Sequence, residues 1–248
     1  QAIYLSHTGT TEGPQGIVAD SYAGNATLNL DSSTKFENGS GTKHPKPSGI
    51  FSEHTTGQAD ITFTGTNQST IPKFLLKVND KTNLKLTQAN VGSSTTIEGT
   101  LGSLTIGTNS IYEPSNNLNT IQNIIITGGG ILKNPHNMTI TNFTGDADGN
   151  AVIQLDTGTS LTINGTIQNQ AKIRVPFSIA NLSSPFITAN SKITDEPFSY
   201  DPNSTQKIYR LEKKLENSST KWYLKNDSGD IPKLGSMLFK EPSSNTVL

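Results

Sequence analysis

Cysteine, long apolar runs and clusters of basic residues are all missing from this sequence. With no cysteine among the 248 residues, a disulfide framework and a thiolate-based metal or catalytic site are excluded. No stretch of about 18 apolar residues occurs, so we expect no segment that spans a membrane as a helix. Arginine occurs only at positions 174 and 210 and the net charge is −1, whereas nucleic-acid binding relies on clustered Lys and Arg. We therefore expect neither membrane insertion nor a nucleic-acid partner.

Apolar and charged residues are both scarce, and small polar residues take their place. Hydrophobic residues make up 31% of the chain and charged residues 16%. A disordered chain also has few hydrophobic residues, but it usually carries a high net charge, which this chain lacks. No window combines apolar residues at helical spacing with caps at both ends. Short runs with period-2 alternation, separated by Gly, Asn, Asp or Ser, instead predict an ordered all-β protein.

A short apolar motif returns at a fixed interval along the chain. It occurs at residues 84–87, 104–107 and 124–127, which is an interval of 20 residues. Such a period indicates a solenoid, in which each coil buries its apolar face against its neighbours. We therefore predict a right-handed parallel β-helix, although a sandwich or barrel also has strands at similar short spacings. Ten apolar residues are predicted to point inward and stack: Ile61, Phe63, Leu84, Leu86, Leu104, Ile106, Ile124, Ile126, Leu161 and Ile163.

The pattern divides the chain into three parts. Residues 1–58 are predicted to form an irregular N-terminal β portion, because Gly and Pro interrupt any regular repeat there. Residues 59–190 are predicted to form the β-helix coils, with Gly128, Gly129 and Gly130 at a tight corner that only glycine accepts cheaply. Residues 191–248 are predicted to form a C-terminal capping hairpin and a tail.

Asp146, Asp148 and Asn150 are the sharpest polar cluster in the sequence. Oxygen ligands at alternate positions beside a glycine resemble a calcium loop. The match to an EF-hand is incomplete, because no Glu stands at the twelfth position and no helices flank the segment. The alternative interpretation is a turn between coils in which Asp and Asn are turn formers. Calcium at these three residues is the only cofactor that the sequence suggests.

Residues for catalysis are harder to find. Asp146 or Asp148 with Asp156, from adjacent coils, would provide a carboxylate pair for glycoside hydrolysis. The segment 174–179 resembles the Arg-x-Pro-x-x-Arg motif of pectate lyases, which also fold as β-helices, but Ile179 replaces the second arginine. The four histidines, at positions 7, 44, 54 and 136, show no metal-ligand spacing. We therefore assign no catalytic residue and expect a protein that is not an enzyme.

After residue 190 the pattern changes to two strands around a polar turn. Lys207–Leu211 and Lys221–Leu224 flank the turn, and the second strand carries the only tryptophan. An open solenoid end exposes unpaired backbone and needs a cap. We predict that this cap consists of Tyr209, Leu211, Trp222 and Leu224, whose aromatic side chains bury large areas.

The same hairpin resembles the end of the passenger domain of classical autotransporters, the type V secreted bacterial surface proteins. In that family a hairpin of this form, the autochaperone region, seals the last coils. The resemblance implies a location outside the cell or on the bacterial surface. The chain begins at Gln1 and ends at Leu248 without a linker helix or a barrel, which predicts a processed passenger or a fragment.

The functional expectation follows from these features together. Long faces of Thr, Asn and Lys favour adhesion or surface display, through weak polar contacts with a host surface protein, a glycan or a second copy. Two alternatives stay open at this point. One is a polysaccharide-cleaving β-helix of the lyase or phage tailspike type, which a cleft with three or more acids would favour. The other is a structural spacer.

Overall fold

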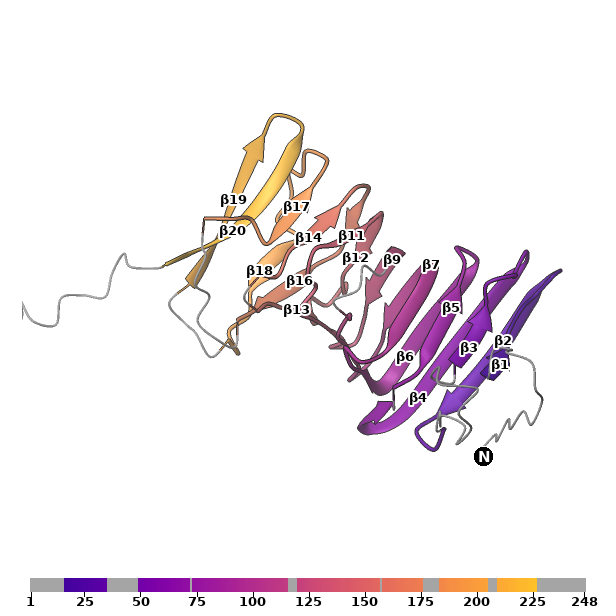
Figure 1. Cartoon of the computed structure of the whole chain (residues 1–248). Coiled ribbons are helices and arrows are strands. Elements are labelled where there is room, and N and C mark those ends of the chain that lie inside the picture. The colour runs from indigo at the N-terminus through magenta and orange to yellow at the C-terminus, as the bar shows by residue number, and fades with distance from the viewer. Residues whose placement is uncertain are drawn as a thin grey trace, which may run out of the picture.

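A computed structural model describes residues 16–34, 49–71, 73–115, 120–156, 158–175, 183–204 and 209–226. Every regular element in these ranges is a strand, and nearly all strand pairs are parallel. The strands stack one beyond another into an elongated solenoid, from β1 at one end to β20 at the other (Figure 1). The predicted parallel β-helix is thereby confirmed. Within the described ranges there is no helix with the length and apolarity that crossing a membrane requires.

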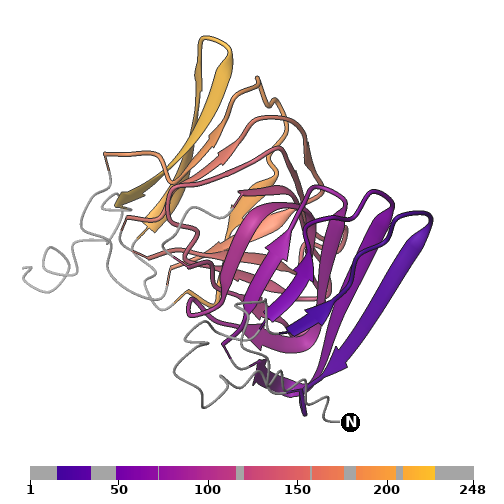
Figure 2. The ribbon, with the colours of Figure 1, turned by 45° about the vertical axis from the view of Figure 1, so that its right-hand side comes forward.

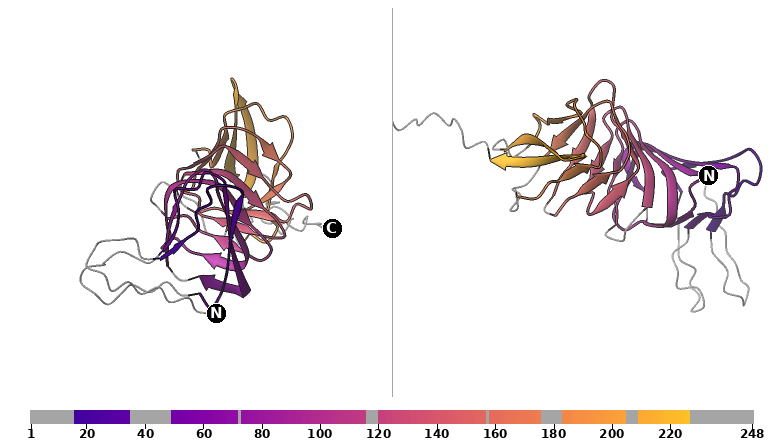
Figure 3. Two further views of the ribbon diagram at one scale, coloured as in Figure 1. Left: turned by 90° about the vertical axis from the view of Figure 1, so that its right-hand side faces the viewer. Right: turned by 90° about the horizontal axis from the view of Figure 1, so that it is seen from above.

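Each coil has three faces, which the chain visits in a constant order. The view along the stack shows the coils superimposed around one interior (Figure 3, left). The face that the chain visits first in each coil is called the first face. It comprises β1 (Gly16–Val18), β3 (Gly49–Ser52), β5 (Leu75–Val78), the start of β7 (Thr96–Ile106), β11 (Met138–Ile140), β14 (Leu161–Ile163) and β17 (Ile187–Ala189).

The second face, called the middle face, is a continuous parallel ladder. It comprises β2 (Asn25–Asp31), the first parts of β4 (Gln58–Ile71) and β6 (Thr82–Val91), the rest of β7, β9 (Thr120–Ile126), β12 (Asn142–Thr144) and β15 (Ile167–Gln168). The third face comprises the ends of β4 and β6, β8 (Ile111–Tyr112), β10 (Ile131–Lys133), β13 (Ala151–Gln154), β16 (Ala171–Arg174) and β18 (Phe198–Tyr200).

The apolar motif forms the stacked interior, as its 20-residue interval predicts. Leu84 aligns with Leu104, and Leu104 with Ile124, on successive strands of the middle face. Each of these side chains is at most 1% exposed. All ten residues predicted to point inward are buried: Ile61, Phe63, Leu84, Leu86, Leu104, Ile106, Ile124, Ile126, Leu161 and Ile163. Burial of one apolar face per coil is therefore what holds the coils together.

The coils begin earlier than the boundary predicted at residue 59. β2 already pairs in parallel with β4, with Leu28 aligned to Ile61, and β1 pairs with β3. Residues 16–34 and 49–58 thus belong to the solenoid rather than to an irregular portion. At the other end, β18 extends the parallel third face to Tyr200, beyond the limit predicted at residue 190.

The corners of the coils use residues that accept a left-handed backbone. At the corner that follows β9, Gly128 and Gly129 have φ of 57° and 79°. Gly130 closes the same corner, where a Cβ atom would lie 2.2 Å from the carbonyl oxygen of Ile106 in the preceding coil. Only glycine fits such an approach. Elsewhere asparagine takes the left-handed conformation, as at Asn109 and Asn134, each with φ of 50°.

The parallel stack ends in an antiparallel hairpin, as the sequence predicts. β19 (Tyr209–Glu216) and β20 (Ser219–Asn226) pair along their whole length. β20 also pairs antiparallel with β17, so the hairpin extends the first face by two strands. In Figure 2 the hairpin, in yellow, projects beyond the outline of the coils. Because the hairpin reverses the strand direction, it terminates the parallel repeat.

Candidate functional site

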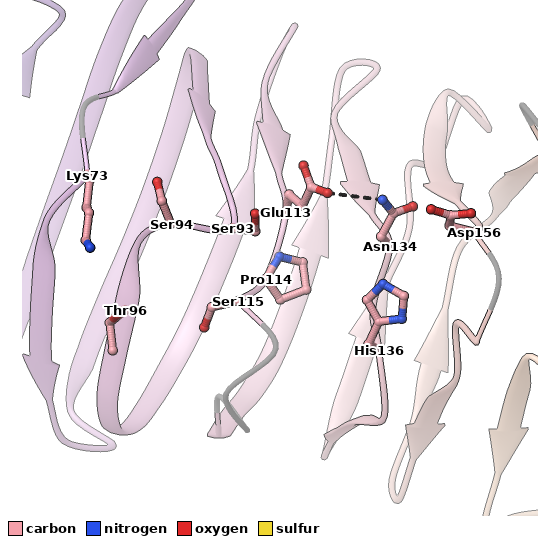
Figure 4. A pocket seen from close by; sticks show the side chains of 10 residues that line it. All are labelled: Lys73, Ser93, Ser94, Thr96, Glu113, Pro114, Ser115, Asn134, His136 and Asp156. Carbon is pink, nitrogen blue, oxygen red and sulfur yellow. Dashed lines mark hydrogen bonds between the residues drawn. The ribbon is translucent and has the colours of Figure 1, made fainter.

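A polar hollow of about 540 Å³ follows the corner between the third face and the first face of the next coil. Because this corner recurs in each coil, the hollow crosses several coils and is referred to as the corner groove (Figure 4). Its lining residues are Lys73, Ser93, Ser94, Thr96, Glu113, Pro114, Ser115, Asn134, His136 and Asp156. Acids, amides and hydroxyls dominate this lining, and Pro114 is its only apolar member.

Glu113 is the first carboxylate of the groove, and it is held on two sides. It follows β8, where its backbone amide donates to the carbonyl oxygen of Val91 at 2.9 Å. Lys133 Nζ lies 2.9 Å from Oε2 of Glu113, and Asn134 Nδ2 donates to Oε1 at 3.1 Å. Both partners come from the next coil. The carboxylate is therefore fixed in position as an acceptor.

Asn134 lies at the centre of the groove and has one unmatched atom. Its backbone amide donates to the carbonyl oxygen of Gln154 at 2.9 Å, and its side chain is enclosed, with 8% of the residue exposed. Nδ2 faces Glu113, and Figure 4 shows the amide oxygen turned toward Asp156. That oxygen, Oδ1, is shielded from solvent and has no hydrogen-bond partner among the described residues. A buried acceptor left without a donor costs about 1–3 kcal/mol.

Asp156 is the second carboxylate of the groove and follows β13 in the coil beyond Asn134. Its backbone amide donates to Oγ1 of Thr159 at 2.8 Å, while its carbonyl oxygen accepts from the Thr159 amide at 3.1 Å. These two bonds close a tight turn in which Gly158 has a left-handed φ of 79°. The turn holds the half-buried carboxylate of Asp156 over the groove.

The middle face offers a contrasting set of polar side chains, called the polar ladder. It is built on aligned outward positions of successive strands, and its side chains bond to one another from coil to coil. Asn83 Nδ2 donates to Asp60 Oδ1 at 2.8 Å, and Ser103 Oγ donates to Asn83 Oδ1 at 2.7 Å. Further along, Asn142 Nδ2 donates to Asn123 Oδ1 at 2.7 Å. The donors and acceptors of the polar ladder therefore bond to one another within the solenoid.

The predicted calcium cluster lies in the turn between β12 and β13. Asp146 Oδ2 accepts from the Gly128 amide at 2.7 Å, and Oδ1 accepts from the Asp148 amide at 3.1 Å. The Asp146 carboxylate therefore ties this turn to the preceding coil, as a turn former does. Asp148 and Asn150 are exposed. Calcium at this turn stays a prediction.

The acid pair considered for glycoside hydrolysis does not meet. Asp146 and Asp148 precede β13, whereas Asp156 follows it. At about 3.3 Å per residue the strand places them at opposite corners of the same coil, more than about 10 Å apart. Arg174, from the segment that resembles a lyase motif, binds the fully buried carboxylate of Asp201 through Nε at 2.7 Å. Its role is to join β16 to the coil beyond, and residues 176–179 lie outside the described ranges.

The cap residues lie at the end of the interior. Trp222, Leu224 and Tyr209 are at most 4% exposed, and Leu211 packs against the core with part of its surface exposed. The Trp222 ring meets Phe198 edge-on, with centroids 5.0 Å apart, and Phe198 in turn lies 5.8 Å from Phe143. Three aromatic rings thus continue the apolar stack into the hairpin. Such contacts add to the stabilisation from buried area.

The outer side of the hairpin carries a charged cluster around Tyr223. Lys221 Nζ lies 2.5 Å from Oε2 of Glu216, and this hydrogen bond lowers the pKa of Glu216 and raises the pKa of Lys221. Tyr223 donates to Oε1 of Glu216 at 3.2 Å. Burial, with the nearby Glu216 carboxylate, raises the pKa of Tyr223. The cluster braces the two strands of the hairpin.

The sequence points to His136 only as one of four scattered histidines and to Asp156 only as a partner for Asp146 or Asp148, and it does not reveal the groove. The structure places both residues on the groove lining. His54 lies elsewhere, 3.7 Å from Glu53, and the histidines at positions 7 and 44 lie outside the described ranges. Their positions relative to the strands could have revealed the groove, because Glu113, Asn134 and Asp156 each follow a third-face strand and lie one coil apart.

Comparison with known proteins gives no family for the chain. No protein-family model matches the sequence, and searches of curated proteins and of solved structures find no significant match.

Proposed function

We propose that this chain is a binding module of a bacterial cell-surface or secreted protein, which acts in adhesion or display. It takes a polar ligand, a host or environmental glycan, in the corner groove. The observation that carries the proposal is the set of acid, amide and hydroxyl side chains gathered in that groove. The resemblance of the C-terminal hairpin sequence to the end of an autotransporter passenger domain supports the proposed location.

A glycan suits the groove better than a protein surface does. The centre of a typical protein interface is apolar and depleted of charge, whereas the groove holds Lys73, Glu113, His136 and Asp156 with one proline. Sugar hydroxyls can both donate and accept, which matches a mixed lining of carboxylate, amide and hydroxyl groups. The polar ladder of the middle face is less suited, because many of its donors and acceptors bond within the solenoid.

The second candidate is a polysaccharide-cleaving enzyme, and one observation favours it. Two carboxylates, Glu113 and Asp156, line one groove, and two acids can suffice for glycoside hydrolysis. Against it, Glu113 is engaged by Lys133 and by Asn134. These contacts occupy both oxygens of the Glu113 carboxylate, whereas a general acid must be able to reach the substrate. The groove lining also holds only two acids among the described residues, Glu113 and Asp156, whereas a cleft with three or more acids would favour an enzyme.

One experiment tests both candidates. The purified chain is applied to an array of bacterial and host glycans, and each retained glycan is then incubated with it in solution. A binding module retains a subset of glycans and leaves their chain length and reducing ends unchanged. Release of new reducing ends or unsaturated sugars would make the chain an enzyme. Failure to retain any glycan, with retention of host proteins instead, would contradict the proposed ligand.

A further inference from the structure

The lining of the corner groove is distributed along the solenoid rather than gathered at one point. Its residues follow the third-face strands β4, β6, β8, β10 and β13, which pair in succession. In that order these strands are followed by Lys73, Ser94, Glu113, Asn134 and Asp156, and Figure 4 shows the five side chains in a row. Neighbouring strands lie about 4.8 Å apart, so the row is roughly 20 Å long.

The backbone along this row is committed to contacts between the coils. The Thr96 amide donates to the carbonyl oxygen of Phe74 at 3.2 Å. The Asn134 amide donates to the carbonyl oxygen of Gln154 at 2.9 Å. A peptide that binds as an added strand requires unpaired backbone groups at a sheet edge, which these positions do not offer. A ligand of the groove is therefore recognised by side chains.

Each coil contributes only a few polar side chains to the row. Ser93 and Ser94 are exposed on a turn that the Thr95 amide closes by donating to the carbonyl oxygen of Gly92 at 3.1 Å. The acids and the amide of the lining come from later coils. A single terminal sugar reaches one or two coils, because a pyranose unit is about as long as the strand spacing of about 4.8 Å. Only a ligand that extends along the row contacts hydroxyl, acid and amide groups together.

Charges of both signs are mixed along the row. Lys133 lies 2.9 Å from Glu113 beside the groove. The lining itself holds Lys73 and His136 together with Asp156. A polymer with a charge on each unit would meet a group of its own sign somewhere along the row, which is unfavourable. The mixture favours an uncharged ligand, whose hydroxyls both donate and accept hydrogen bonds.

We propose that the corner groove takes a linear, uncharged polysaccharide that lies along the solenoid axis, with about one sugar unit per coil. This inference rests on the proposed glycan binding and specifies the class of glycan. The contacts are mainly hydrogen bonds, since Pro114 is the only apolar side chain among the described lining residues. Each net hydrogen bond corresponds to about a two- to tenfold change in affinity. Longer chains therefore bind more tightly until the row is filled.

The test is the dependence of affinity on chain length, measured by titration calorimetry. The probes are dimers to hexamers of chitin, cellulose, xylan and mannan, with polyuronate oligomers and branched host glycans for comparison. Affinity for the series that binds rises by about two- to tenfold per unit and levels off at about four units. Added salt leaves it unchanged, because no charged pair forms with the ligand.

The outcomes separate this inference from the proposed function. Equal affinity for dimers and hexamers, or binding of polyuronates or branched glycans alone, overturns the linear, uncharged ligand and leaves glycan binding intact. Binding of no glycan at all contradicts the proposed function itself, and this inference with it.

Two variants block opposite halves of the row. Ser94→Trp adds bulk to an exposed turn in one half, and His136→Trp adds it in the other. Each shortens the usable row, so affinity levels off at about two units instead of about four. The matched control Thr64→Trp, at an exposed position of the middle face, levels off as the parent does. An unchanged length dependence in Ser94→Trp, whose exposed position tolerates the bulk, overturns the proposal even if His136→Trp does not fold.

Discussion

The middle face and the corner groove are both polar, yet they use their polar groups in opposite ways. On the middle face, Asn142 donates to Asn123, and Asn123 Nδ2 donates to the carbonyl oxygen of Gly102 at 2.8 Å. In the groove, Oδ1 of Asn134 has no partner among the described residues. Polar groups that bond from coil to coil hold the solenoid in register. A buried polar group without a partner requires an explanation, which a bound water or a ligand would supply.

The difference shows that polarity alone does not identify a binding surface in a solenoid. Stacked coils bring equivalent side chains within hydrogen-bond distance, so a row of Asn or Thr supports its own neighbours. A site requires a departure from that regularity. In the corner groove, the regular row is broken because Asn134 lies between Glu113 and Asp156 (Figure 4).

The largest expected loss of stability comes from the C-terminal hairpin, which lies outside both regions. Trp222→Ala removes a side chain that is 1% exposed and packs edge-on against Phe198. We expect the free energy of unfolding to fall by about 3–5 kcal/mol, as measured by denaturant unfolding. Binding in the groove stays unchanged under conditions where the variant is folded. An alanine variant as stable as the parent would contradict the capping role of the hairpin.

On the middle face we expect an intermediate effect. Asn123→Ala leaves Nδ2 of Asn142 and the carbonyl oxygen of Gly102 without their partners, at about 1–3 kcal/mol in the free energy of unfolding. The control Lys85→Ala changes an exposed residue of the same face and stays within about 0.5 kcal/mol. Equal effects for the two variants would mean that the ladder does not stabilise the solenoid.

In the groove, we expect that removing the asparagine side chain of Asn134 lowers the free energy of unfolding by less than Asn123→Ala does. Asn134→Gly loses the hydrogen bond to Glu113, but it also removes a buried acceptor that lacks a partner. Glycine accepts the φ of 50° without strain. In metal-free buffer the free energy of unfolding changes by less than about 1 kcal/mol. A loss larger than that of Asn123→Ala would reverse the comparison between the two regions.

The smallest effect concerns pH and the outer side of the hairpin. The folded-state pKa of Glu216 is lowered, first by its hydrogen bond to Lys221. Its stabilisation is therefore present above the ordinary glutamate pKa and is lost as the pH falls through the lowered value. Because solvent reaches both side chains in part and screens the ion pair, the effect is small. Glu216→Gln should flatten the loss of stability between about pH 5 and about pH 3, as denaturant unfolding at each pH will measure.

The sequence predicted the interior of the solenoid well, because stacking repeats the same kind of residue. Leu84, Leu104 and Ile124 occupy one position in three coils, and their interval is visible in the sequence. The first coils were missed for a related reason. Leu28 aligns with Ile61 in space, but the longer connection between β2 and β3 breaks the interval between them. An insertion at a corner preserves the stack and hides the period.

The groove was not predictable from sequence in the same way. Glu113, Asn134 and Asp156 come from three coils and share no residue type, so no repeated pattern marks them. Their significance depends on orientation, since Asn134 would not face both acids without its left-handed backbone. The sequence instead suggests Asp146 with Asp156 as a pair of acids. Because β13 lies between those two residues in the chain, they are at opposite corners of the same coil.

We propose that recognition belongs to the corner groove and not to the middle face. The most direct test compares two matched variants on the glycans that the parent chain retains. Ser94→Trp fills the groove, and Thr64→Trp adds the same bulk to an exposed hydroxyl position of the middle face. We predict that Ser94→Trp weakens glycan binding by at least about tenfold, which corresponds to 1.4 kcal/mol, while Thr64→Trp binds as the parent does. Loss of binding in Thr64→Trp, with Ser94→Trp unaffected, would contradict the claim.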